Sequence, residues 1–523
     1  MQTQSQEAMS RRDLVAGLGV GGLVSMGMTR AASRDAGTTE AYLADTDRHT
    51  DAGAAEMAAG AKAGEEPLVI SGVMPRLGVS ATLSGPRSEA GIGALMPWGD
   101  RLWFVTYTAH TDTTGGGTGL YYVDASMRLH KHPASVVGTY ANRFVHVPSE
   151  QLFIGPHVID VHNKVRTIEP LAGYRLTATM AHLHDPANKV YVLGMESELW
   201  EVDVRTLDVK LLFTLNFDLK LPAGYKPHYK GGFNAGDRII VGNNTYHERD
   251  AVEGISTGGR LAEWDGKSEW RTVESTAFCD IAGTRMGDHA AAMAIGWDRA
   301  SVLLNVLTRG KWTRYRLPKA SQTFDHAWYT EWPRIREVET ERYLIDMHGM
   351  FYEAPKAAYG GQYWGLKPIC QHLRIVPDFC TWRGMLVLAG DQVTAVTGNA
   401  HLVGEPQSNL WFGKTDDLWS FGKPAGWGGV WQDTPVKAGE PSDPFLMTGF
   451  DRKCLHLVHD AGEAVVFTIQ VDFLGNGRWV QYERLKVPAA GYVHHEFPAG
   501  FSAHWVRIVP HASCRATAQF VYT

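Results

Sequence analysis

The chain has 523 residues, of which 44% are hydrophobic and 20% are charged, and its formal net charge is −6. This length exceeds what one hydrophobic core usually serves, so we expect two domains or a repeat array. The mildly acidic balance gives no reason to expect a nucleic acid or an anionic membrane as partner. Abundant aromatic residues (17 Trp, 19 Tyr and 19 Phe) and 56 glycines favour a sheet-rich fold, and exposed Trp and Tyr suit sugar binding.

Residues 1–32 have the pattern of an export signal. Arg11 and Arg12 precede the apolar run LVAGLGVGGLVSMGM, and small residues follow at Ala31 and Ala32. This pattern is typical of a twin-arginine signal peptide, and the run is too short and glycine-rich for a comfortable membrane span. The alternative is a chance arginine pair before a signal anchor. We expect export to the periplasm or the extracellular space, with residues 33–65 as a flexible linker.

From Gly91 onward, strand–turn–strand units recur every few tens of residues. The segments that open or carry these units are GALMPWGDRLWFVTYTAH, NRFVHVPSEQLFIGPHVID, RLTATMAHLHDPANKVYVLGME, HYKGGFNAGDRIIVGNNTYHERD, AAAMAIGWDRASVLLNVLTRG, HAWYTEWPRIREVETERYLIDMHGMFYEAP and LRIVPDFCTWRGMLVLAG. Four-strand units at this spacing are the signature of a β-propeller, whose blades bury their faces against their neighbours. The sequence therefore predicts an all-β protein with a seven-bladed propeller over residues 66–421, the blade number being fixed to within one.

Residues 422–523 have a different pattern. Segments such as FLMTGFDRKCLHLVHD, EAVVFTIQVDFLG and AHWVRIVP alternate apolar and polar positions between Gly, Asp and Pro turns, without a blade repeat. This predicts an appended β-sandwich. The five cysteines show no zinc spacing; Cys454 and Cys514 could form a disulfide within this region, or all five could be buried free thiols.

The propeller prediction places a particular set of side chains at one mouth of the central channel. In a blade, the residues just before the first strand and just after the second strand lie at the same face. The positions before first strands hold Asn142, Arg143, Arg175, His228, Tyr229, Lys230 and His326. The positions after second strands hold His110, His157, Glu196, Asn243, Asn244, Tyr246 and His348.

The segment from His228 to Asp250 is the clearest example. It reads as two short strands around a Gly236-Asp237 turn, which brings the two polar ends of the segment to the same end of a hairpin.

This set of side chains suits β-elimination at a uronic acid. A base removes the C5 proton, the carboxylate charge is neutralised by Arg, Asn or a cation, and the O4 leaving group departs. Conventional glycoside hydrolysis needs two carboxylates beside the scissile bond, and the mouth offers only Glu196 and Glu331 as candidates. The residue types therefore favour a lyase.

Each candidate also has a structural interpretation. His110 could cap the turn before TDTTGGGTG, and Arg143 and Arg175 could form ion pairs between blades. Tyr246 could pack beside two turn-forming asparagines. His182 and His184 resemble a metal pair, but they lie at the far end of their strand, where a structural role is favoured.

Several segments taken together resemble a known family. GIGALMPWGDRLWFVTYTAH, GTGLYYVD, VVGTYANRFVH, RLTATMAHLHDPANKVY, GGFNAGDRIIVGNNTYHERD and GYVHHEFPAGFSAHWVRI resemble the propeller family of L-rhamnose-α-1,4-D-glucuronate lyases, which is related to α-L-rhamnosidases acting on the same linkage. The resemblance covers residues 67–523. It implies a seven-bladed propeller, histidine-based elimination, a calcium ion deep in the channel and, as substrate, the rhamnosyl-glucuronate cap of arabinogalactan side chains such as those of gum arabic.

By this resemblance, His110 is the first candidate for the catalytic histidine. Tyr246, His228 and Arg143 are the candidates for a second catalytic residue, and no calcium ligands can be assigned from the sequence. The expected substrate-binding residues are Arg175, Tyr229, Lys230, Asn243, Asn244, His326 and His348. We expect a monomer acting on a plant-type acidic polysaccharide, and the alternatives are an α-L-rhamnosidase or a non-catalytic carbohydrate-binding propeller.

Overall fold

The computed structural model describes residues 72–73, 79–80, 90–108, 119–221, 223–225, 227–245, 247, 250, 257–320, 332–390, 392–393 and 406–523. The predicted signal peptide (1–32) and linker (33–65) lie outside these residues. Strands are the main regular structure of the described chain, which also has one α-helical turn, α2 (Leu215–Asp218), and a few short 3-10 turns. The all-β prediction is thus confirmed. No helix in the described part of the chain is long and apolar enough to cross a membrane.

Most of the chain folds into four-stranded antiparallel sheets whose strands follow one another in sequence. The first sheet contains β3 (Ala90–Trp98), β4 (Arg101–Thr108), β5 (Leu120–Val123) and β6 (Leu129–Lys131). The second contains β7 (Arg143–His146), β8 (Gln151–Ile154), β9 (His157–Asp160) and β10 (Val165–Thr167). The third contains β11 (Leu176–Ala181), β12 (Lys189–Gly194), β13 (Glu198–Asp203) and β14 (Val209–Thr214). The fourth sheet contains β15 (Tyr229–Asn234), β16 (Ile239–Asn243), β17 (Arg260–Trp264) and β18 (Arg271–Glu274). The fifth contains β19 (Ala277–Thr284), β20 (Ala291–Trp297), β21 (Val302–Thr308) and β22 (Lys311–Leu317). The sixth contains β23 (Arg334–Glu339), β24 (Arg342–Met347), β25 (Met350–Pro355) and β26 (Lys367–Gln371).

One further sheet combines strands from distant parts of the chain. β27 (Phe379–Trp382), β28 (Met385–Ala389) and β31 (Leu410–Gly413) are completed by β1 (Gly72–Val73) as the outer strand, with Gly72 opposite Phe412 and Val73 opposite Trp411. A second small sheet contains β2 (Val79–Ser80), β30 (Pro406–Ser408) and β29 (Gln392–Val393). Along the chain, β2 follows β1, and β29 and β30 lie between β28 and β31. The chain therefore joins its beginning to its last four-stranded unit, a closure that the sequence did not reveal.

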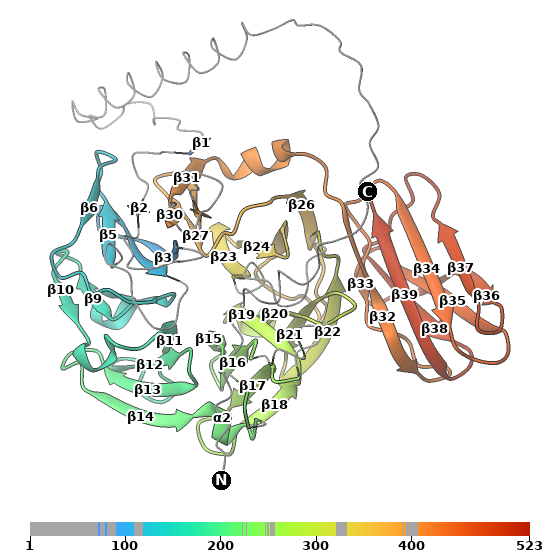
Figure 1. The fold of residues 1–523 in the computed structure, drawn as a ribbon, viewed down its shortest axis with the longest axis horizontal. Coiled ribbons are helices and arrows are strands. Elements are labelled where there is room, and N and C mark those ends of the chain that lie inside the picture. Colours follow the sequence, from blue (N-terminus) through green and yellow to red (C-terminus); the bar gives the residue numbers. More distant parts are fainter. Residues whose placement is uncertain are drawn as a thin grey trace, which may run out of the picture. The chain divides into compact units, whose positions relative to one another are not determined.

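The sheets are arranged radially, as in a β-propeller (Figure 1). Their first strands contact one another in the order β3, β7, β11, β15, β19, β23 and β27, and β27 contacts β3. Glycines allow this close approach near the axis: a Cβ on Gly93 would lie 1.9 Å from the Tyr140 carbonyl oxygen, and one on Gly231 would lie 2.6 Å from that of Cys279. Apolar side chains fill the space between neighbouring sheets, Trp103, Phe153 and Trp200 among them.

The C-terminal strands form two antiparallel arrays. One is β32 (Gly426–Val436), β39 (Cys514–Tyr522), β34 (Lys453–His459) and β37 (Tyr492–Glu496); the other is β33 (Phe445–Leu446), β38 (Trp505–Pro510), β35 (Val465–Asp472) and β36 (Val480–Val487). Both contribute to one apolar cluster that also includes residues of β20–β25.

Two features connect the C-terminal arrays to the radial sheets. β33 extends sheet β19–β22 by pairing in parallel with β22. Asp443 accepts hydrogen bonds from Arg314 Nε at 2.9 Å and Arg316 Nε at 2.8 Å. These contacts fix the C-terminal strands to one edge of the radial array.

The five cysteines are all free. Cys454 lies opposite Val521, at the other end of β39 from Cys514, so the strand register separates the two candidate disulfide partners. The free-thiol interpretation is therefore correct.

The pairing of β1 with β31 can be tested by deletion. A chain beginning at Arg76 lacks β1 and leaves β31 as an unpaired edge, whereas a chain beginning at Glu66 keeps β1. We expect the thermal unfolding midpoint to fall by several degrees in the shorter chain and to stay unchanged in the longer one. Equal midpoints would show that β1 contributes nothing to closure. The measurement is differential scanning calorimetry on both chains.

Candidate functional site

The predicted hairpin at His228–Asp250 forms as expected over its described residues. β15 and β16 are antiparallel, Tyr229 lies opposite Asn243, and Gly236 has a φ of +105° in the turn between them. His228 Nδ1 is 2.8 Å from Asn244 Oδ1, and the Asn244 amide donates a hydrogen bond to the His228 carbonyl at 3.1 Å. The register therefore brings both predicted polar clusters to one end of the hairpin.

The hydrogen bonds around His228 define its proton arrangement. The His228 amide donates to Thr245 Oγ1 at 3.0 Å, which fixes the backbone, and Asn244 Oδ1 can only accept a hydrogen bond. Nδ1 therefore carries the proton, and Nε2 carries the lone pair in the neutral ring. This is the state that a general base requires.

Tyr229 and Asn243 are completely buried, unlike side chains that stand on a ligand-binding surface. In the described part of the chain Asn244 Nδ2 has no hydrogen-bond partner, and burial raises the pKa of Tyr229 while its hydrogen bond with the Asn243 side chain opposes that rise. Tyr229 and Asn243 are as deeply buried as Lys230 and Arg334, and their contact with substrate stays a prediction.

Trp332, which the sequence reading did not select, is the centre of a buried cationic cluster beside β15. Its ring stacks on Tyr107 with centroids 4.5 Å apart. Lys230 Nζ lies 4.9 Å from the ring centroid, and Arg334 Cζ lies 5.1 Å from it. Both cations are almost fully buried, at 2% and 1% exposure. Two desolvated cations beside one indole are held by cation–π attraction, which offsets only part of the cost of burial.

Arg334 lacks a carboxylate partner among the described residues. Its Nη1 donates to the Pro333 carbonyl oxygen at 2.8 Å, and its buried Nε has no hydrogen-bond partner. Burial lowers the pKa of Arg334, because the charged form loses its hydration. Arg334 and Arg336 lie on the same face of β23, two residues apart, and Arg336 lines the channel cavity. Arg334 itself is 1% exposed and does not line that cavity, and Asp280 and Asp378 attract its charge without forming an ion pair with it.

A chain of four buried ionic side chains crosses the same region. Asp378 pairs with Arg143 Nε at 3.0 Å and with Arg336 Nε at 2.7 Å, and Arg336 Nη1 continues to Asp280 at 2.7 Å. Asp378 also accepts the Leu95 amide at 2.8 Å, and Asp280 accepts the Ile335 amide at 2.8 Å. Arg334 and the ion-pair chain together make a cluster of three guanidinium groups and two carboxylates, and Arg285, Glu337 and Glu339 also line the cavity beside it.

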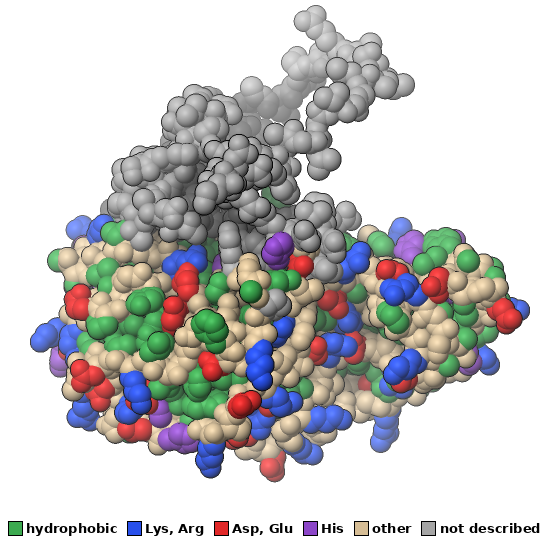
Figure 2. Space-filling view, turned by 60° about the horizontal axis from the view of Figure 1, so that its bottom comes forward, with side chains coloured by type: hydrophobic (Ala, Val, Ile, Leu, Met, Phe, Trp, Pro, Cys, Tyr) green, Lys and Arg blue, Asp and Glu red, His purple; other side chains and the backbone are tan. Residues whose placement is uncertain are grey.

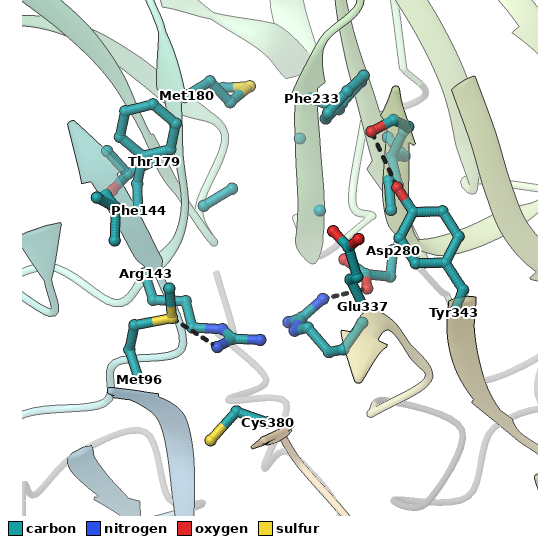
Figure 3. Close-up of a pocket in the computed structure, with 18 of the residues that line it drawn as sticks. Met96, Arg143, Phe144, Thr179, Met180, Phe233, Asp280, Glu337, Tyr343 and Cys380 are labelled. Carbon is teal, nitrogen blue, oxygen red and sulfur yellow. Dashed lines mark hydrogen bonds and ion pairs between the residues drawn. The ribbon is translucent and has the colours of Figure 1, made fainter. Parts of the chain in front are cut away.

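A cavity of about 1020 Å³ extends from this ion-pair chain along the later parts of the first strands. Phe144, Met180 and Phe233 line its walls, and Arg143 and Cys380 lie at the opposite side of the cavity from Phe233 (Figure 3). The cavity therefore combines apolar walls with charged side chains both at the ion-pair chain and at Arg285, Glu337 and Glu339.

Three of the predicted site residues, His110, Tyr246 and His326, lie outside the described residues, so their roles remain predictions. The contacts of Arg143 and Arg175 agree with the structural interpretation of these arginines as ion-pair residues. Arg143 donates to the Leu95 carbonyl at 2.7 Å and the Phe379 carbonyl at 3.2 Å besides pairing with Asp378, and Arg175 Nε donates to Glu196 Oε1 at 2.5 Å. Both guanidinium groups are therefore already engaged within the protein.

His348 lies away from the channel, contrary to the prediction that it contacts substrate. It occupies the turn between β24 and β25 and packs edge-on against Trp297, with ring centroids 5.4 Å apart. The side chain is 2% exposed, and both ring nitrogens lack hydrogen-bond partners. Burial lowers its pKa well below the ordinary value, so the ring is neutral and structural.

A calcium ion does not fit the described part of the channel. Calcium takes six to eight oxygen ligands, but Asp280 and Asp378 already bind guanidinium groups whose charge repels a cation. No group of three or more His, Cys, Asp or Glu side chains in the described chain is arranged to hold a metal. His182 pairs instead with Glu201 at 2.9 Å and stacks on Tyr191.

The sequence contained signals for three of the missed residues. Asp378 immediately precedes β27, the same position relative to a first strand that identified Arg143 and His228. Asp280 interrupts the apolar strand AFCDIAG. Arg334 opens the first strand β23 as Arg143 opens β7, so the same positional signal was present, whereas Trp332 gave none.

Comparisons with known proteins identify no family: no protein-family model and no curated protein matches the chain. Among solved structures, the β-propeller domain of Myceliophteria thermophila Cps50 (Swd1) is similar with a TM-score of 0.35 and 12% identity, covering 63% of this chain and 98% of that one. Hydrazine synthase of Kuenenia stuttgartiensis has a TM-score of 0.33 and 11% identity, with coverages of 57% and 80%. The β-propeller domain of the Trilobed protease from Pyrococcus furiosus has a TM-score of 0.31 and 9% identity, with coverages of 62% and 94%. Similarity this low says nothing about function.

The ion-pair chain makes a stability prediction. Asp378→Ala leaves Arg143 without its carboxylate and Arg336 with only one, so we expect the free energy of unfolding to fall by about 3–5 kcal/mol. Asp443→Ala, which also removes a carboxylate from two arginines, should cost less, because its side chain is 23% exposed and Arg316 keeps Asp298. Urea unfolding of the two variants measures the difference, and equal losses would contradict the central role of Asp378.

Proposed function

We propose that the radial sheets are the blades of one seven-bladed β-propeller and that the two C-terminal arrays form a β-sandwich. The ring of contacts among the seven first strands supports the blade number, and the shared apolar cluster of the two arrays supports the sandwich. β1 would then close the ring by supplying the outer strand of the last blade.

We further propose that the protein is a polysaccharide lyase that cleaves L-rhamnose-α-1,4-D-glucuronate linkages by β-elimination. The observation that carries this proposal is Arg334, a buried guanidinium with no described carboxylate partner, next to Lys230, a second buried cation, and beside the ion-pair chain. Removing an unpaired guanidinium from water is costly, and an anionic ligand group would offset that cost. The carboxylate of a uronic acid supplies such a group.

In the proposed reaction, a base removes the proton from C5 of the glucuronate. The electron pair forms the C4–C5 double bond, the C4–O4 bond breaks, and an acid protonates the departing rhamnose oxygen. Negative charge develops on the carboxylate during proton removal, and Arg334 would stabilise it electrostatically. His228, with its lone pair on Nε2, is suited to act as the base or to assist it. His110 remains the first candidate for the other proton transfer, with Tyr246 as the alternative.

Conventional hydrolysis finds less support in the described channel. Glu337 is paired with Lys356, and Glu339 accepts a hydrogen bond from Thr415, while Asp280 and Asp378 are bound to arginines. Glu337, Asp280 and Asp378 are thus neutralised by cations, and Glu339 is the described carboxylate of this group that is bound by a neutral hydroxyl, whereas inverting and retaining glycosidases require two carboxylates on opposite sides of a bond.

The proposed location follows from the amino-terminal residues. A twin-arginine signal would deliver the protein to the periplasm or the extracellular space, where plant-type acidic polysaccharides are encountered. The face in view in Figure 2 has Lys and Arg interspersed with Asp and Glu, and this mixture supports neither a nucleic-acid nor an anionic-membrane partner.

The role of Arg334 can be tested by substitution. Arg334→Met should lower the elimination rate on rhamnose-capped arabinogalactan by about a hundredfold or more, because a charge-stabilising donor is lost. Arg285→Met is the matched control: Arg285 lines the other end of the cavity and should have little effect. The measurement is the ultraviolet absorbance of the unsaturated uronate product, with thermal unfolding to confirm folding. Rhamnose release without that absorbance would replace the lyase by a rhamnosidase, and binding without either product would indicate a non-catalytic propeller.

His110 provides an independent test of the proton-transfer assignment. His110→Ala should reduce elimination by about a hundredfold, the typical contribution of a positioned acid or base. His348→Gln should leave the rate within severalfold, since His348 is buried away from the channel. A small effect at His110 would transfer its role to His228.

A further inference from the structure

Two loops outside the channel present large apolar side chains to solvent. The loop between β25 and β26 exposes Tyr359 (43%) and Trp364 (46%), and the loop between β35 and β36 exposes Phe473 (59%) and Leu474 (61%). Exposed apolar groups are individually common, but a contiguous group of this kind marks an interaction site.

The two loops are in direct contact. Gly475 has a φ of +71°, and a Cβ at this position would lie 2.7 Å from Trp364 Cβ. A Cβ on Gly477 would lie 3.2 Å from the Gln362 side chain. These glycines allow the second loop to lie against the first, so Phe473 and Leu474 stand on a loop that adjoins Trp364. We call the surface made of Tyr359, Trp364, Phe473 and Leu474 the aromatic patch.

Both loops are held rigidly by hydrogen bonds. Tyr359 and Gln362 exchange backbone hydrogen bonds of 3.1 and 3.0 Å around Gly360 and Gly361, both with positive φ. The buried Asp472 carboxylate accepts the amides of Gly475 at 2.9 Å, Asn476 at 3.2 Å and Gly477 at 2.7 Å. The patch is therefore preformed, and little conformational entropy is lost when a ligand binds.

The rings of the patch form a short aromatic row. The Tyr359 and Trp364 centroids are 6.1 Å apart, and His289 lies 4.9 Å from Tyr359. Tyr and Trp present an apolar face together with a polar edge, which matches a pyranose ring, whose C–H groups form an apolar face and whose hydroxyls lie around it. Gln362 and Asn476 are adjacent hydrogen-bonding side chains without charge.

The charges beside the patch favour a neutral ligand. Lys356 is paired with Glu337, which leaves Arg478 as the other charged side chain that the two loops expose. An acidic polymer would need several cations at the surface that binds it, and the two loops supply only Arg478 and the paired Lys356. A protein partner would need roughly 20–30 residues on each side, and the aromatic patch is far smaller.

We propose that the aromatic patch is an ancillary site that binds neutral pyranose residues of a polysaccharide, such as the uncharged backbone to which acidic side chains are attached. This inference rests on the proposed function only in taking a polysaccharide as the ligand. Binding at the patch would hold the polymer near the protein while its charged end groups reach the channel. The patch would raise affinity for the polymer without taking part in the chemical step.

The test uses the full chain and a double variant, Tyr359→Ala with Trp364→Ala. Tyr174→Ala is the matched control, because Tyr174 is equally exposed (41%) on the radial sheets and packs on Trp200. Native gel electrophoresis is run with and without arabinogalactan from which rhamnose and glucuronate have been removed. We expect the neutral polymer to retard the parent and the Tyr174 variant, and the double variant to lose this retardation.

Kinetics separate the patch from the channel. The double variant should keep its rate on a short rhamnosyl-glucuronate oligosaccharide and raise KM for the polymer severalfold with kcat unchanged. Arg334→Met should show the opposite pattern, with retardation kept and activity lost. If the parent protein has no lyase activity but the retardation depends on the patch, only the proposed function fails.

Three results would overturn the patch proposal. They are absence of retardation in the parent, unchanged retardation in the double variant, and a dimer in light scattering that the double variant dissociates. The last result would identify a second copy of the chain as the occupant.

Discussion

The buried chain Arg143–Asp378–Arg336–Asp280 is the interaction on which the centre of the structure depends. Through side-chain pairs and the amides of Leu95 and Ile335, two carboxylates connect the first strands of five sheets. Each buried ion loses hydration, and only complete pairing offsets this cost. The guanidinium groups therefore also donate to backbone carbonyls, such as those of Leu95 and Phe379. The chain fixes the positions of the first strands relative to one another, and with them the geometry of the channel.

Arg334 is unusual beside the ion-pair chain. Its neighbours in the channel are paired, whereas Arg334 contacts only an indole ring and one carbonyl oxygen. A protein can retain such a group where binding requires it, because a preorganised charge needs no rearrangement when an anion arrives. The ion-pair chain provides the rigidity that this preorganisation requires. His228 shares that end of the first strands, so an anion-binding group and a candidate base lie on adjoining elements.

The two sites proposed in the channel and at the aromatic patch would divide recognition between charge and shape. The channel carries buried cations and suits a negatively charged sugar, while the patch carries aromatic rings with few charges and suits a neutral one. A branched polysaccharide with acidic end groups on a neutral backbone contains both ligands. The two surfaces could therefore bind different parts of one molecule, with the patch contributing affinity and the channel contributing chemistry.

The sequence by itself determined the all-β class, the recurring four-strand units and the hairpin at His228, because turn glycines and short-range alternation encode local strand pairing. It also predicted that polar residues before first strands gather at the channel, as Arg143 does. Only the tertiary structure decided what those residues contact. Asp378 neutralises Arg143 from a position 235 residues further along the chain, β1 pairs with β31 across most of the protein, and Trp332 brings Lys230 to Arg334. These contacts depend on how the sheets close into a ring, and no local pattern in the sequence records a long-range pairing of charges.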